Sequence, residues 1–148
     1  IQAQDSDGTN DGDLHLTGHL NDDLNLLNIK AVTTAMNGNL TATGTVTATS
    51  YTEAVFAVTG TTPALDPANG SIQTWTLSAA STPTSNLSSG ESMTLMIEDG
   101  TAYSITWPTM TWVNNGGAAP TLATSGKTVV ALWNVAGNLY GSFVGNGS

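Results

Sequence analysis

The stretch SMTLMIEDGTAYSITW, residues 92–107, determines the kind of fold that we expect. Apolar side chains at Met93, Leu95 and Ile97 alternate with other residues over 92–98, and a second alternating run covers 102–107. Period-2 alternation is typical of a β-strand with one buried face. The Asp-Gly pair between the two runs is a strong signal for a tight hairpin turn. We therefore expect an antiparallel β-hairpin here, and an all-β fold around it.

Short strand-like segments continue on both sides of this hairpin. The expected strands are 54–58, 71–77, 110–113, 127–135 and 139–144. Gln73, Trp75 and Leu77 fall on one face of the second of these. Because residues 127–135 are apolar on both faces, we expect this strand in the centre of a sheet. Residues 136–138 form a turn signal that leads it into a final hairpin. Short strands at this spacing are the pattern of a β-sandwich or a small barrel, and a β-sandwich over residues 54–148 is a sufficient fold for them.

Residues 1–53 have a different composition, with no Trp, Phe or Pro. The pattern G-x-L-x-x-T-G-x-(L/V) occurs twice, at 12–20 and at 38–46. The second copy continues to residue 51, and Thr occupies every odd position from 41 to 49. This alternation predicts a strand whose apolar face is too small to be stable alone. We therefore expect residues 1–53 to form an extended repeat segment that needs strand partners, either in a sheet or from other chains.

Charge is scarce and mostly negative. The 148 residues include two basic and 11 acidic residues and no cysteine, and the formal net charge is −9. Charged residues make up 9% of the chain, against about 25% in an average soluble domain. So acidic a chain is not expected to bind nucleic acid or to dock on an anionic membrane. The absence of cysteine excludes disulfides and thiolate nucleophiles.

No apolar run approaches the roughly 18 residues of a transmembrane helix, so we expect no membrane insertion. The first residue is Ile1 rather than Met, from which we expect a processed product or an excerpt of a longer protein.

An acidic loop near the start of the chain is the candidate metal site. Four aspartates alternate with small residues and glycines: Asp5, Asp7, Asp11 and Asp13. Hard oxygen ligands on a tightly turning backbone are what Ca²⁺ requires. The register of a helix–loop–helix calcium loop fails, because position 12 counted from Asp7 is Gly18. A solvated acidic loop and an irregular Ca²⁺ site both remain open, and we expect no other cofactor.

The two histidines are the second candidate for a metal site. His15 and His19 lie four residues apart. On a strand this spacing separates them by about 13 Å, too far to share a metal within one chain. Copies of one histidine that meet on a three-fold axis would be close enough, so this alternative depends on the oligomer.

Catalysis is not expected. Both histidines lie outside the strand-rich part, so a Ser-His-Asp triad is not indicated. Glu98 and Asp99 fall on an expected solvent face and in the expected turn, which does not favour a glycosidase pair. Three aromatic residues are candidates for stacking on a sugar, namely Trp107, Trp112 and Tyr140. Packing in the core is the alternative role for the same side chains.

Two parts of the chain resemble proteins of bacteriophage particles. GNLTATGTVTATSYTEA, residues 38–54, resembles the Gly-Thr repeats in the shafts of tail fibres. The later run, with ITWP at 105–108, WVNNGG at 112–117 and APTL at 119–122, resembles β-domains in virion structural and tail-fibre proteins of marine phages, notably those that infect cyanobacteria. The resemblance covers residues 38–145 and brings no catalytic residue with it.

The resemblance implies a structural virion protein of a homotrimeric tail fibre or fibre-like appendage that serves host attachment. Residues 1–53 would form its extended shaft or attachment segment, and residues 54–148 its β-sandwich head domain. Its partners would be copies of itself, other virion proteins and a host surface glycan or protein, and its place the surface of the particle. Two alternatives stay open: a capsid decoration or head-fibre protein, and a glycan-binding β-sandwich module.

Overall fold

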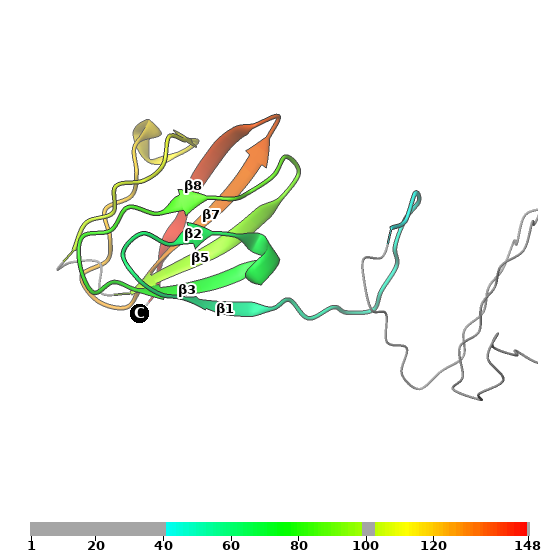
Figure 1. Cartoon of the computed structure of the whole chain (residues 1–148), viewed down its shortest axis with the longest axis horizontal. Helices are drawn as coiled ribbons and strands as arrows, with labels where there is room; N and C mark the ends of the chain where they lie inside the picture. The colour runs from blue at the N-terminus through cyan, green and yellow to red at the C-terminus, as the bar shows by residue number, and fades with distance from the viewer. Residues whose placement is uncertain (1–40, 99–102, 148) are drawn as a thin grey trace, which may run out of the picture. The chain divides into compact units, whose positions relative to one another are not determined.

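The computed structural model describes residues 41–98 and 103–147 (Figure 1). The chain comprises two compact units, Ile1–Val46 and Thr47–Ser148. In the first unit the described residues, 41–46, are exposed and belong to no helix or strand. The second unit holds all of the described strands. The boundary that we expect between residues 53 and 54 stays a prediction.

The described residues of the second unit form two β-sheets. The elements are β1 (Val55–Val58), β2 (Ala64–Leu65), η1 (Pro67–Asn69), β3 (Ile72–Thr76), β4 (Thr84–Ser85), β5 (Ser92–Glu98), β6 (Thr111–Trp112), η2 (Asn115–Gly117), β7 (Lys127–Val135) and β8 (Asn138–Gly147). Six strands form the main sheet in the order β1-β3-β5-β7-β8-β6, and β2 pairs with β4 in a small second sheet. The prediction of an all-β fold is confirmed.

The first five strands wind between the two sheets. β1, β3 and β5 are parallel neighbours in the main sheet, and β2 and β4 are parallel neighbours in the small one. We call residues 61–65 and 81–87, which include β2 and β4, the second layer. Three backbone hydrogen bonds join its two segments: Thr82 N donates to Thr61 O at 2.7 Å, Thr84 N to Pro63 O at 2.9 Å, and Asn86 N to Leu65 O at 2.9 Å. Parallel neighbours need a crossover connection. The segments between β1 and β3 and between β3 and β5, which contain β2 and β4, provide it.

The hairpin predicted at Asp99-Gly100 is wrong. β5 pairs with β3 along one edge and with β7 along the other, so neither edge is free for the run that follows. That run instead lies along the second layer, where Ser81 N donates to Ser104 O at 2.9 Å and Thr106 N donates to Ser81 O at 2.8 Å. Between β3 and β7, the apolar side chains of β5 face the core, and their burial outweighs the local turn preference.

The final hairpin is confirmed. β7 and β8 are antiparallel and are joined through Ala136 and Gly137. β7 lies between β5 and β8, so its predicted central position is also confirmed.

The core lies between the two sheets. Gln73, Trp75 and Leu77 are all buried on one face, as the alternation predicts. Other strands of the main sheet add Met93, Leu95, Ile97, Val130 and Leu132, and the second layer adds Leu65 and Leu87. Figure 1 shows β2 against this face of the main sheet. We call the opposite side of the main sheet the outer face; its residues, such as Thr74, Met96 and Val129, are only half-buried.

Candidate functional site

The three aromatic residues proposed to bind a sugar do not form one site. Trp112 is only 8% exposed and belongs to the hydrophobic core. It pairs with Gly141 across β6 and β8, and its ring would come within 2.9 Å of a Cβ atom added to that glycine. Trp107 packs edge-on against Trp112 with ring centroids 5.2 Å apart. Trp112 therefore has a packing role.

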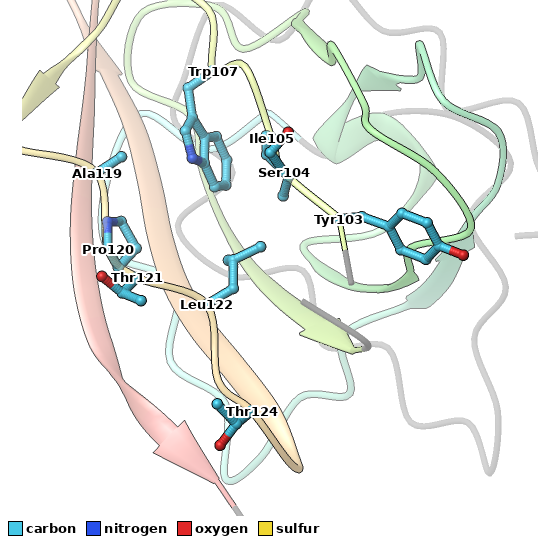
Figure 2. Close-up of a pocket in the computed structure, with 9 residues that line it drawn as sticks. All are labelled: Tyr103, Ser104, Ile105, Trp107, Ala119, Pro120, Thr121, Leu122 and Thr124. Atoms are coloured by element: carbon cyan, nitrogen blue, oxygen red, sulfur yellow. The ribbon is translucent and has the colours of Figure 1, made fainter. Parts of the chain in front are cut away.

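Trp107 borders an open pocket of about 390 Å³ between two loop segments (Figure 2). The pocket is lined by Tyr103, Ser104, Ile105, Trp107, Ala119, Pro120, Thr121, Leu122 and Thr124. Figure 2 shows Trp107 and Leu122 projecting toward each other from the two segments, while the Tyr103 ring points away from them. This lining contains no Asp, Glu, Lys or Arg, so it suits an uncharged ligand with apolar and hydroxyl groups.

Tyr140 lies on the outer face of the main sheet. It stacks on Trp133 with ring centroids 5.9 Å apart and an interplanar angle of 13°. The two residues are direct partners in the β7–β8 register. Trp133 was not among the sequence candidates, although its alternation with the buried Leu132 places it on this side of the strand.

A smaller pocket of about 240 Å³ lies beside Trp133. Its polar lining comes from Glu53, Ser71, Ser92 and Thr94. Ser71 Oγ donates to a Glu53 carboxylate oxygen at 2.9 Å, which ties the segment before β1 to the start of β3. This part of the outer face therefore carries an aromatic pair beside hydroxyl groups and the Glu53 carboxylate.

An ion pair lies on the outer face at the end of the sheet where β5 ends and β7 begins. Lys127 Nζ donates to a carboxylate oxygen of Glu98, and Thr76 Oγ1 donates to the other at 3.1 Å. These two hydrogen bonds, together with the positive charge of Lys127, lower the pKa of Glu98 below its ordinary value. The three residues lie on three different strands, so the pair links β3, β5 and β7.

The candidate metal ligands Asp5, Asp7, Asp11 and Asp13 lie outside the described residues, as do His15 and His19. Within 41–98 and 103–147, no three His, Cys, Asp or Glu side chains come together as a metal would require. Among the helices in that same part of the chain, none is long and apolar enough to cross a membrane.

The two edges of the main sheet differ. At one edge, the short strand β6 pairs with part of β8, and we call this the β8 edge. Just after β6, Val113 N donates to Gly141 O at 2.9 Å, and the Asn114 side chain bonds twice to the backbone of Phe143. At the opposite end, no strand of the described chain pairs with the outer edge of β1. Residues 47–57, which lead into and include most of β1, are all exposed.

Comparisons with known proteins find no match: no family model fits the chain, and neither a curated protein nor a solved structure is similar to it.

Proposed function

We propose that the chain is a structural component of a bacteriophage particle, a homotrimeric tail fibre or fibre-like appendage that serves host attachment. The observation that carries this proposal is that residues 41–54 are exposed and have no strand partner within the described chain. Their sequence alternates as a strand does up to residue 51, yet in this single chain they form no strand and every one of them is exposed. A segment that is competent to pair but has no partner in its own described chain favours a partner in another copy.

The residue types of this segment support the same proposal. Thr fills the odd positions from 41 to 49, and β-branched residues favour extended backbone. Exposed apolar side chains accompany them, with Val46 at 63% and Tyr51 at 81% exposure. The resemblance of this stretch to the Gly-Thr repeats of fibre shafts agrees with an intertwined arrangement of three chains.

The mass and shape of the full chain in solution test this proposal. Light scattering should give about three times the 15.1 kDa of one chain at micromolar concentration, and negative-stain images should show elongated particles. Antibodies raised against the chain should label an appendage of the virus particle that carries it. A monomer in solution, or label confined to the capsid shell, would contradict the proposal.

Glycan binding is a second candidate, favoured by the 390 Å³ pocket. Its aromatic, aliphatic and hydroxyl lining matches a neutral sugar, whose C–H faces stack on aromatic rings while its hydroxyls bond to Ser and Thr. This activity would complement attachment rather than replace the structural role.

A screen of neutral oligosaccharides tests the second candidate. Trp107→Ala should weaken any binding by about tenfold through lost ring contact, because this ring projects toward Leu122 across the pocket. Tyr140→Ala, on the outer face, is the matched control and should leave binding unchanged. No binding to any neutral oligosaccharide, or equal losses in both variants, would count against this pocket.

A further inference from the structure

The hydrogen-bond pattern shows which backbone groups of β1 face β3 and which have no strand partner within residues 41–98 and 103–147. Ile72 N donates to Ala54 O at 3.4 Å, and β1 runs parallel to β3 from there. In a parallel pair, alternate residues of a strand face the same neighbour. Ala54, Phe56 and Val58 therefore face β3. The N–H and C=O groups of Val55 and Ala57 point away from the sheet, toward the open edge.

The side chains at this edge are apolar and uncovered. Val55 is 65% exposed and Phe56 is 37% exposed. An exposed apolar edge strand is a template for another strand, and proteins normally protect such edges. This chain does protect its β8 edge, where the Asn114 amide occupies the backbone groups of Phe143. The contrast indicates that the β1 edge is left open for a partner.

We propose that a second copy of this chain pairs with residues 47–57 along the β1 edge. The inference deepens the proposed fibre function, and it rests on that function, by naming the surface through which copies associate. Main-chain hydrogen bonds to Val55 and Ala57 would supply the contact, as in other cases of strand addition.

Charge does not oppose a copy of the same chain at this position. Two chains that each carry a net charge of −9 repel each other, so they associate through a stretch that adds little charge. Residues 47–57 contain one charged residue, Glu53. Six of these eleven residues are Thr, Val, Tyr or Phe, so each copy offers a segment that is itself suited to pair.

A pair of matched valines tests the location. Val55 on β1 and Val144 on β8 are both 65% exposed, so an aspartate at either position perturbs the fold to a similar small degree. In the full chain, Val55→Asp should weaken the association of copies at least tenfold in sedimentation velocity. Val144→Asp should leave the sedimentation coefficient and its concentration dependence unchanged.

A second variant tests the backbone bond directly. Ala57→Pro removes the outward N–H group of residue 57. The β1–β3 pair does not use this group, so the second unit should keep its near-ultraviolet circular dichroism spectrum. Pro fits extended backbone at an edge strand. Association should again fall at least tenfold, while the unfolding midpoint of the dissociated chain stays the same.

The outcomes separate this inference from the proposed function. If the wild-type chain is a monomer, both are wrong. If it is a trimer and neither Val55→Asp nor Ala57→Pro weakens it, the trimer stands and the β1 edge is not its interface. Equal weakening by Val55→Asp and Val144→Asp would also overturn the assignment to β1. If Val55→Asp fails to fold, the result with Ala57→Pro decides the matter alone.

Discussion

Asn114 and Phe143 are joined in the way that two neighbouring strands are joined. Asn114 Nδ2 donates to Phe143 O at 2.8 Å, and Phe143 N donates to Asn114 Oδ1 at 2.9 Å. A side-chain amide here takes the place of a peptide group beyond the short strand β6. The arrangement satisfies the edge of β8 and leaves no backbone pair of Phe143 for another chain.

Removal of this amide should loosen the β8 edge. Asn114→Ala breaks both bonds and should lower the free energy of unfolding by about 1–2 kcal/mol. Asn114→Asp keeps an acceptor for Phe143 N but loses the donor to Phe143 O, so it should fall between Asn114→Ala and wild type. Urea unfolding followed by Trp fluorescence measures both. Asn146→Ala, at an exposed asparagine of β8, is the control and should change little.

Gly141 should tolerate no side chain, because the Trp112 ring covers it. A Cβ atom there would lie 2.9 Å from the ring, so Gly141→Ala forces the indole to shift and should cost about 1–3 kcal/mol. Gly147→Ala, in the same strand, places its Cβ in open space and should be close to neutral. Thermal unfolding of the two variants checks the difference. Equal effects would show that the Trp112 contact is not responsible.

Gln73 should be needed as an amide donor. Its side chain is fully buried, and Nε2 donates to Asp66 O at 2.7 Å and to Gly70 O at 3.1 Å, which holds η1 against β3. Gln73→Met keeps the volume but removes both hydrogen bonds, and Asp66 O then keeps its bond from Asn69 N, at a cost of about 1–3 kcal/mol. Gln73→Glu places a carboxylate against the same carbonyls and should cost about 3 kcal/mol or more. Denaturant unfolding at neutral pH should give this order, and the reverse order would contradict it.

Glu98 should contribute to stability in a pH-dependent way. Its pKa in the folded chain is lowered from the ordinary 4.5 by the hydrogen bonds from Lys127 and Thr76 and by the Lys127 charge. A lowered folded pKa means that the contribution is fully present above the unfolded value. It disappears as the pH falls through the folded value. Urea midpoints measured between pH 7 and pH 2 should therefore fall more steeply for wild type than for Glu98→Gln. Parallel curves would contradict the role of the pair.

The sequence by itself determined where most strands lie and which side of each is buried. Residues 92–98 form β5 with Met93, Leu95 and Ile97 inside, and the alternation of residues 71–77 buries Gln73, Trp75 and Leu77. Alternation is a local property, because successive side chains of any strand point to opposite faces. Alternation did not predict the strands β2 and β4, because each has two residues, too few to show a period.

Only the tertiary structure decided which strand lies beside which. The Asp-Gly pair after β5 is a strong local turn signal, yet β5 takes β3 and β7 as neighbours because that position buries its apolar face. The same choice of neighbours separated the aromatic candidates. Trp112 on the edge strand β6 is buried in the core, whereas Tyr140 stacks on Trp133 on the outer face. Alternation assigns a side chain to a face, whereas pairing depends on burial summed over strands far apart in the chain, which no short stretch of sequence contains.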